Sequence, residues 1–445
     1  MTAARLLWVP APYRAGFCVT DDPDTATTAQ VRAVYDVLLA HGCPATKAVW
    51  PFSPTEPSGI PPLPEEVLRG ATLENEDYAA CCRSLRDRGV ELCLHGASAG
   101  NNRRERTLDA LSAMRRDFPG SRIFICHAKN AENPYWGEKV TSRAPLRALL
   151  RLYATHRSEG ATEASPYFWG DACRREALFI RLYRTRRMNT LARNPCMPYA
   201  DRAKPYVAGW FSATKRSFAD CTLPKALERL KRQYGLTVLY QYLHRYADPV
   251  TLDIDPAFLE GVQRLGRDPD ILVAPAGFML QRLLLMQGVF LLQHRGALSV
   301  LNLNRTRVDN VQILVGNGAR AERVDAGSIP ADSLVPVPDP RPLTAKGRNA
   351  ITLDAGGKGS CSLGMRTVHI DRERSAAKTR MVWRVTPEMP EDGHPFRTLS
   401  VKEECILFFG QLAIIAREVL LRQRGVRNMR WLQGESIPLE DHRNW

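Results

Sequence analysis

Carboxylates and imidazoles stand directly after several short β-rich runs of the chain. The consecutive Asp21 and Asp22 follow the first run, and His95 and His127 follow two later ones. Parallel-strand enzymes bind their ligands at the carboxyl ends of strands, so these side chains are expected to converge. Carboxylate oxygen and imidazole nitrogen suit zinc or another divalent first-row ion, and three protein ligands leave a position for water. The pattern indicates a hydrolytic metal site, while helix capping is the structural alternative for the aspartates, and Asp24 fits capping best.

The elements that would position these residues alternate between strands and helices from residue 15 to about 290. This alternation predicts a parallel sheet with crossover helices. The expected strands cover 15–20, 45–51, 90–95, 122–127, 236–242 and 271–274. The expected helices cover 27–40, 76–87, 104–117, 224–234, 256–265 and 277–293. Residues 141–212 show no single regular pattern and are expected to be mixed.

The pattern of expected elements changes after about residue 295. Residues 298–303 and 308–315 favour a β-hairpin, and 330–342, with five prolines in thirteen residues, indicates a linker or domain edge. A helix is expected near 401–424, begun by a capping box of Ser400 and Glu403, as a core helix of a second domain. The predicted division is an α/β domain over 1–290 and an α+β accessory domain of unknown role over 291–445.

Composition narrows the class of protein. The chain has 445 residues, 44% of them hydrophobic, and 62 Lys+Arg against 47 Asp+Glu give a formal charge of +15. This is a globular composition, and the longest apolar stretches, 279–292 and 405–416, are interrupted and short of the ~20 residues of a spanning helix. The N-terminus has no secretory apolar region, and the 11 scattered cysteines indicate reduced thiols, so a cytoplasmic location is expected.

The positive charge has two interpretations. It is either an unspecific consequence of an Arg-rich composition or a sign of an anionic partner, such as a nucleotide sugar or a lipid diphosphate headgroup. No helix-turn-helix, zinc-finger or aromatic RNA-binding signature surrounds the basic clusters, so specific nucleic-acid binding is not expected.

The chain resembles the polysaccharide deacetylases of carbohydrate esterase family 4, the nodulation-type deacetylase domain, whose first motif reads T-F-D-D-G. It is most similar to a divergent, polysaccharide deacetylase-like subgroup. The resemblance covers about residues 12–285. It is carried by Thr20-Asp21-Asp22 and by segments at 46–50, 94–96, 101–105, 127–137, 165–171, 197–199, 204–207 and 210–212.

This resemblance implies a distorted (β/α) barrel, a divalent metal, zinc first of all, and hydrolysis of an N-acetyl group on an amino sugar. In the family the first Asp is the general base and the second a metal ligand, which correspond to Asp21 and Asp22. The second motif, H-S/T-x-x-H, begins at His95, but its second His is replaced by Ala99. His127 is expected to supply the missing imidazole, so that Asp22, His95 and His127 form the metal triad.

The remaining site residues follow from the same resemblance. The family's last motif provides a His as general acid; Tyr242 occupies that position, and His244, two residues on, is expected to take the role. The substrate cleft is expected to be lined by Lys47, Asn101, Arg103, Asn130, Trp136 and Tyr242. Two of these have structural alternatives, core packing for Trp136 and a surface charge for Arg103.

Two functions are therefore carried forward. The first is a metal-dependent hydrolase that removes an N-acetyl or similar acyl group from an amino sugar in glycan biosynthesis. The second is a catalytically silent barrel that binds a glycan or a partner protein. Ala99 and Tyr242, which replace family histidines, support this second function. Convergence of Asp22, His95 and His127 to within ligand distance distinguishes the two.

Overall fold

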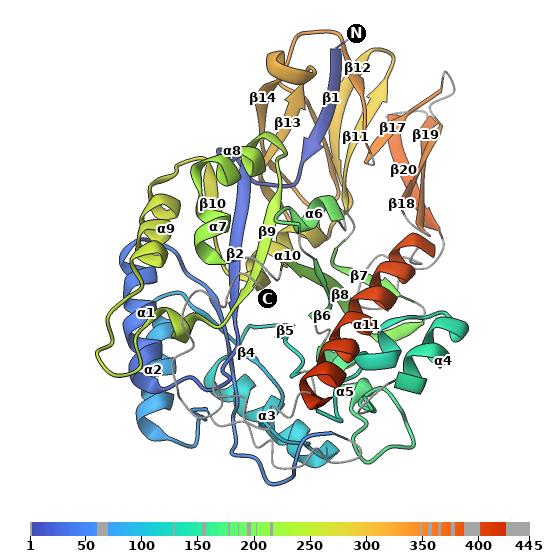
Figure 1. Ribbon diagram of the computed structural model, residues 1–445. Coiled ribbons are helices and arrows are strands. Elements are labelled where there is room, and N and C mark those ends of the chain that lie inside the picture. The colour runs from blue at the N-terminus through green and yellow to red at the C-terminus, as the bar shows by residue number, and fades with distance from the viewer. Residues whose placement is uncertain are drawn as a thin grey trace.

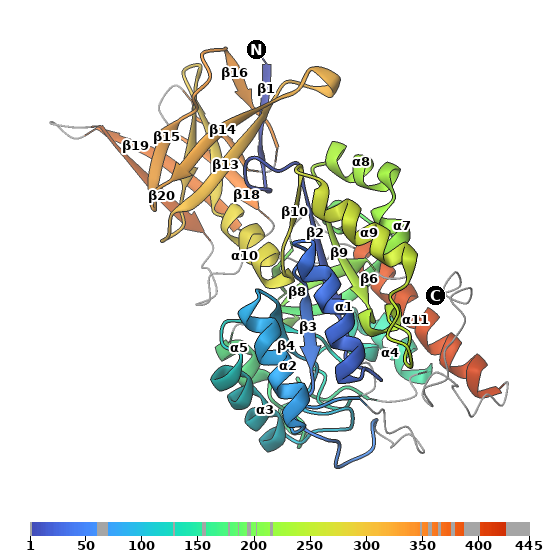
Figure 2. The same ribbon diagram turned by 90° about the vertical axis from the view of Figure 1, so that its left-hand side faces the viewer.

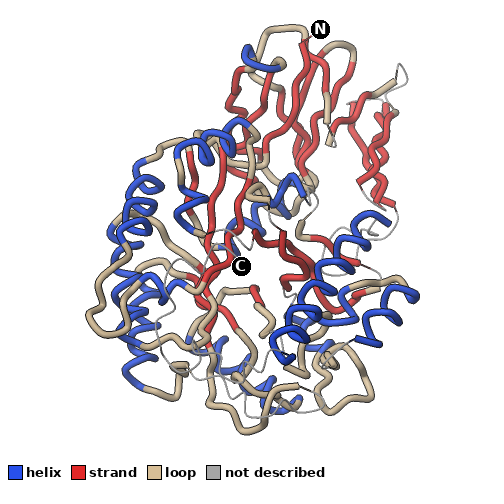
Figure 3. Tube along the Cα trace, in the orientation of Figure 1, coloured by secondary structure: helices blue, strands red, loops and turns tan. Residues whose placement is uncertain are grey.

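The computed structural model (Figure 1) describes residues 2–423 except 60–69, 128–129, 154–156, 177–178, 186, 194–196, 202, 214–216, 348, 355–357, 364–365, 375–378 and 387–400. Strands form the centre of the larger part of the molecule, with helices outside them, and a second part made of strands lies at one end (Figure 3). Within the described residues, no helix is both long and apolar enough to cross a membrane.

The larger part is built on a curled sheet of eight parallel strands. These are β2 (Ala15–Asp21), β3 (Thr46–Val49), β4 (Glu91–Leu94), β5 (Ile123–Phe124), β6 (Phe179–Thr185), β8 (Lys204–Ala213), β9 (Leu236–Gln241) and β10 (Ile271–Val273). Their order is β10-β2-β3-β4-β5-β6-β8, and β9 pairs with both β8 and β2. The short β7 (Tyr199–Asp201) is antiparallel to β8. The prediction of an α/β, barrel-like fold is confirmed at this level.

Helices cover the outside of this sheet, as expected for crossover connections. They are α1 (Thr28–Ala40), α2 (Glu76–Asp87), α3 (Arg104–Asp117), α4 (Ala144–Tyr153), α5 (Gly170–Glu176), α6 (Thr190–Arg193), α7 (Phe218–Thr222), α8 (Pro224–Arg232), α9 (Pro256–Arg267) and α10 (Ala276–Met286). Short 3-10 turns occur at η1 (Gly137–Val140), η2 (Leu243–Tyr246) and η3 (Gly318–Arg320). All seven residues of β2 are buried, because helices and neighbouring strands cover both of its faces.

The start of α1 bears on the alternative interpretation of the aspartates. Its N-cap is Thr27, whose hydroxyl accepts a hydrogen bond from the backbone N–H of Gln30. The capping role for Asp24 is therefore wrong, because the chain turns into the helix three residues later. The carboxylate of Asp24 therefore does not cap α1.

The second part consists of short antiparallel and mixed sheets. One has the order β14-β13-β1-β16 and contains β1 (Thr2–Leu7), β13 (Val308–Val315), β14 (Glu322–Ile329) and β16 (Leu343–Ala345). Another has the order β15-β12-β11-β17 and contains β11 (Val289–His294), β12 (Ala297–Asn302), β15 (Ser333–Pro336) and β17 (Ala350–Thr352). A third contains β18 (Gly359–Leu363), β19 (Arg366–Arg374) and β20 (Thr379–Thr386).

Several predictions for this region are wrong. Residues 289–293 form β11 rather than the end of a helix, and β12 pairs with β11 and β15 instead of forming a hairpin with β13. The Pro-rich segment, predicted as a linker or domain edge, contains β15, which pairs with β12. The N-terminal β1 pairs with β13 and β16. One sheet therefore contains strands from both of the predicted domains, 1–290 and 291–445. Apolar patterns mark strands, but they do not identify the strand's partner.

The helix expected near 401–424 is present as α11 (Val401–Gln423). Its buried Leu407, Phe408 and Ile415 join the hydrophobic core of the barrel-like part. Glu404 accepts hydrogen bonds from the hydroxyl of Thr141 and from the backbone N–H of Ser142, the latter at 3.0 Å. The expectation of a core helix in a second domain is therefore wrong; Ser400 of the expected capping box lies outside the described residues.

The two parts meet at α10 and the first loop of the chain (Figure 2). The guanidinium of Arg282 on α10 donates to the carbonyls of Trp8, Asp309 and Asn310, at 3.1, 2.6 and 3.3 Å. Burial lowers the pKa of Arg282 to about 10, against an opposing effect of Asp309. The group stays protonated at neutral pH, so these are charge-assisted hydrogen bonds.

Candidate metal centre

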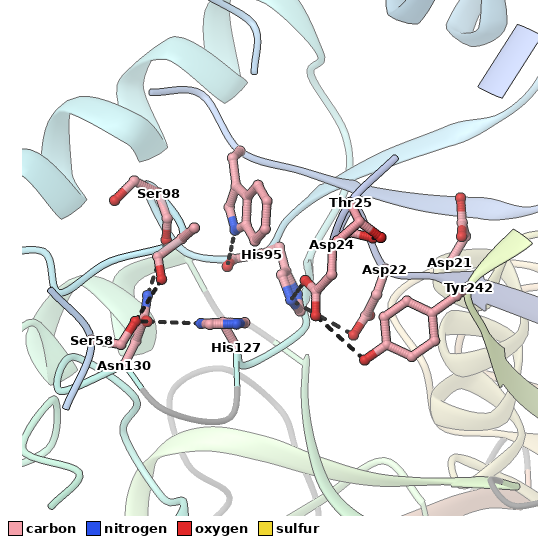
Figure 4. Close-up of polar contacts among 12 residues, drawn as sticks. Asp21, Asp22, Asp24, Thr25, Ser58, His95, Ser98, His127, Asn130 and Tyr242 are labelled. Carbon is pink, nitrogen blue, oxygen red and sulfur yellow. Dashed lines mark hydrogen bonds and ion pairs between the residues drawn. The ribbon is translucent and has the colours of Figure 1, made fainter. Parts of the chain in front are cut away.

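Three buried side chains converge where β2 and β4 end. Nε2 of His95 lies 3.6 Å from Oδ2 of Asp22 and 3.4 Å from Oδ1 of Asp24 (Figure 4). The three residues offer ligand atoms that all lie within 4.8 Å of one another. Asp22 and His95 were predicted as metal ligands, and Asp24 replaces His127 as the third member of this group.

The polar atoms of this cluster are incompletely satisfied. Oδ1 of Asp22, Oδ1 of Asp24 and both ring nitrogens of His95 are buried and have no hydrogen-bond partner among the described residues. Unpaired polar atoms are costly in a protein interior, and their concentration at one point indicates a group that binds there. Two carboxylate oxygens and one imidazole nitrogen form a donor set that fits a divalent ion with an open coordination position.

Two tyrosines contact the Oδ2 atoms of the aspartates. Tyr240, on β9, donates its hydroxyl hydrogen to Oδ2 of Asp22, and Tyr242 lies 3.4 Å from Oδ2 of Asp24. The two hydroxyls are also within 2.9 Å of each other. Hydrogen bonds of this kind fix the orientation of metal-binding carboxylates. Tyr242 was predicted to contact substrate, and the structure places it beside Asp24.

The electrostatics of Asp24 favour its carboxylate form. Burial acts to raise its pKa, but the neighbouring imidazoles of His95 and His127 and the guanidinium of Arg245 lower it more, so the net shift is downward. An ionised Asp24 is the form that binds a metal cation.

His127 lies next to the cluster, on the side away from the aspartates. Its ring centroid is 5.4 Å from that of His95. Its Nδ1 is 2.8 Å from Oδ1 of Asn130, and the amide nitrogen of Asn130 donates to Glu132 and to the carbonyl of Ser98. Because the amide nitrogen of Asn130 donates to Glu132 and Ser98, its amide oxygen is the atom that faces His127. An oxygen accepts a hydrogen bond, so His127 carries its proton on Nδ1. Nε2 of His127 is the basic nitrogen.

Asp21 has a different environment from Asp22. Its Oδ2 forms an ion pair with Nζ of Lys47 at 2.9 Å, and accepts from the hydroxyl of Tyr35 at 3.1 Å. Its Oδ1 accepts from the backbone N–H of Leu243 at 2.7 Å. Burial raises the pKa of Asp21, partly offset by Lys47. In Figure 4 the Asp21 side chain points away from the cluster, so Asp21 does not reach the place where a base was predicted, and Lys47, predicted to contact substrate, is paired with Asp21.

His244 is also occupied elsewhere. Its Nε2 lies 3.1 Å from the hydroxyl of Thr25. Burial, with the charges of Arg245 and Lys47, lowers the pKa of His244 to about 3. The imidazole is therefore neutral at pH 7 and lacks the proton that the predicted general acid would donate.

The other predicted cleft residues have structural positions. Asn101 ties two loops together, since its oxygen accepts from the N–H groups of Gly59 and Ala131. Arg103 is exposed and forms an ion pair with Glu56 at 3.0 Å. Trp136 is buried in the core, which agrees with its structural alternative. Ala99, at the position of the family's second His, is also buried.

Sequence reasoning missed two residues of the site, Asp24 and Tyr240. The spacing Asp22-x-Asp24 is a usable signal, because residues two apart share one side of an extended chain. Tyr240-x-Tyr242 carries the same spacing on β9.

Comparison with known proteins identifies no family. No protein-family model matches the chain, and no curated protein matches it either.

Proposed function

We propose that this chain is a metal-dependent hydrolase that uses Asp22, Asp24 and His95 to bind a divalent ion. The observation that carries this proposal is the convergence of these three buried side chains, whose ligand atoms lie within 4.8 Å of one another and each of which has a buried polar atom without a hydrogen-bond partner among the described residues. A structural cluster would be expected to satisfy these atoms internally, whereas a metal site leaves them for the ion.

When bound, a divalent ion supplies Lewis acidity, which lowers the pKa of a coordinated water and polarises an acyl carbonyl. Within the protein, His127 lies beside His95 and is the group proposed to accept the proton of the attacking water, with its ring oriented by the contact between Nδ1 and Asn130. Asn130 in turn is oriented by Glu132. This arrangement transfers the base role, predicted for Asp21, to His127.

The substrate class rests on the resemblance to polysaccharide deacetylases. Under this proposal the chain removes an acetyl or similar acyl group from the amine of an amino sugar, and zinc is the first metal to test. The barrel-like α/β fold agrees with the proposal but by itself supplies no function.

The second candidate is a silent barrel that binds a glycan or a partner protein. The buried ion pair of Asp21 with Lys47 favours it, because the residue at the family's base position is engaged in the core. In this case the cluster would bind no metal.

Metal content, measured by elemental mass spectrometry after zinc loading and dialysis, separates the candidates. We expect about one ion per chain in the wild type, and loss of that ion in Asp24→Asn. The matched control is Asp36→Asn, an exposed aspartate of α1 paired with Arg88, which should keep the ion. A wild-type chain that stays metal-free would refute the hydrolase proposal.

Turnover is measured as acetate release from N-acetylated amino sugars. For His127→Gln we expect retention of the ion and a loss of about 10²–10⁴-fold in turnover, the usual size of a general-base contribution. Loss of the ion in this variant would make His127 a ligand rather than the base.

A further inference from the structure

Arg181 is a buried cation without a hydrogen-bond partner. It lies on β6, and its side chain is 0% exposed. None of Nε, Nη1 and Nη2 has a hydrogen-bond partner within the part of the chain that the structure describes. A guanidinium carries five N–H donors in one plane, and arginine is almost never fully buried unless it is paired. The guanidinium therefore needs a hydrogen-bond acceptor that the described residues do not provide.

The guanidinium belongs to the same site as the metal cluster. Its Cζ lies 4.0 Å from the ring centroid of Tyr240, whose hydroxyl donates to Asp22. The register between β6 and β8 shifts between Arg181 and Tyr183. Bulges of this kind redirect side chains next to active sites. The stacking on Tyr240 stabilises the cation through the ring face, but it leaves the in-plane N–H groups unpaired.

The charges of the site indicate that the missing partner of Arg181 is an anion. Burial works to lower the pKa of Arg181, but the acidic groups of Tyr240 and Asp22 outweigh it, and the guanidinium remains protonated. With a divalent ion in the cluster, the two carboxylates of Asp22 and Asp24 are neutralised by that ion. Arg181 then has no counter-charge, and a buried, uncompensated charge is strongly unfavourable.

We propose that Arg181 binds an oxoanion, a carboxylate or phosphate group of the ligand, beside the metal cluster. This inference deepens the proposed function and rests on it for the identity of the ligand. A planar guanidinium can donate two parallel hydrogen bonds to either group, which gives both affinity and orientation. The oxoanion has two possible sources: the carboxylate released from the acyl group, or an anionic group on the substrate.

The test uses isothermal titration of the full chain with sodium acetate and with inorganic phosphate, with and without zinc. We expect at least one of the two anions to bind the wild type, and to bind at least about 10-fold more weakly to Arg181→Met. Acetate binding more tightly would assign the site to the released carboxylate, and phosphate binding more tightly to an anionic substrate group. Equal binding to wild type and Arg181→Met, or no binding of either anion, would overturn the proposal.

Two controls separate this inference from the proposed function. Arg122 is another arginine that stacks on an aromatic ring, with its Cζ 4.5 Å from the ring centroid of Phe179. Arg122→Met should leave anion binding unchanged. The zinc content of Arg181→Met should equal that of the wild type. If the wild type binds no zinc but binds an anion through Arg181, the hydrolase proposal fails while this inference stands.

Stability provides an independent measurement. Replacing a buried, unpaired charge with an apolar side chain of similar length should raise the thermal midpoint of the ligand-free chain, by about 2–4 °C. A drop in the midpoint of that size would mean that Arg181 contributes to the fold, and would overturn the proposal. Arg181→Lys, which keeps the charge but loses the planar fork, should bind the anion more weakly than the wild type.

Discussion

Asp21 and Asp22 are adjacent in the chain, yet their carboxylates serve two separate environments. Asp21 accepts from Tyr35 and pairs with Lys47 in the core, while Asp22 faces His95 across the end of the sheet. Alternation along an extended chain places consecutive side chains on opposite sides. Asp21 therefore contributes to the core of the barrel-like part, and Asp22 is available to the proposed metal site.

This division predicts a structural role for the Asp21–Lys47 pair. Both side chains are buried, at 1% and 0% exposure, so Lys47→Met leaves an uncompensated carboxylate in the core. We expect it to lower the free energy of unfolding by about 3–5 kcal/mol in urea denaturation. The double variant Asp21→Asn, Lys47→Met removes both charges and should recover most of this loss. A single variant as stable as the wild type would contradict the prediction.

Glu132 predicts a pH dependence of stability. Burial raises its pKa from the ordinary 4.5 of a glutamate to about 7, despite hydrogen bonds from Asn102 and Asn130. Because the folded-state pKa is raised, the contribution of Glu132 to stability is full below about pH 4.5 and is lost as the pH rises through about 7. Between pH 5 and pH 8 the free energy of unfolding should fall by roughly 2 kcal/mol from this group.

The measurement compares the wild type with Glu132→Gln at both pH values. The variant should lack this fall, and the comparison of slopes cancels any constant change caused by altered hydrogen bonds. Equal slopes for the two proteins would show that Glu132 does not titrate in this range.

Tyr240 is predicted to tune the affinity of the metal site. Its hydroxyl donates to Asp22, and loss of such an outer hydrogen bond typically weakens metal binding by about 10–100-fold. Zinc competition with a chromophoric chelator should show this change for Tyr240→Phe. Tyr246→Phe is the control, since Tyr246 donates to Gln241 at 2.6 Å, away from the cluster. Unchanged affinity in Tyr240→Phe would remove Tyr240 from the site.

Arg282 is predicted to join the two parts of the molecule. Arg282→Met removes its hydrogen bonds to the carbonyls of Trp8, Asp309 and Asn310. We expect a destabilisation of about 2–3 kcal/mol, and faster amide hydrogen exchange in β13. The exposed Arg267 of α9 provides a control, because Arg267→Met should change neither quantity. Unaltered exchange in Arg282→Met would show that other contacts hold the parts together.

The sequence by itself determined the alternating strands and helices of the barrel-like part, and the convergence of Asp22 with His95. Periodicity is a local property, and the carboxyl ends of parallel strands meet whatever the details of packing. The same reasoning identified α11 as a helix, since its apolar residues recur at helical spacing.

The tertiary structure alone decided which side chains face the site. Whether Asp21 or Asp22 points inward depends on the placement of Lys47 and Tyr35, which come from other elements. Pairing of β1 with β13, more than 300 residues later, and the burial of Arg181 beside Tyr240 arise from contacts distant in the chain. Local patterns carry no information on such contacts, because they are set by how the whole chain packs and not by neighbouring residues.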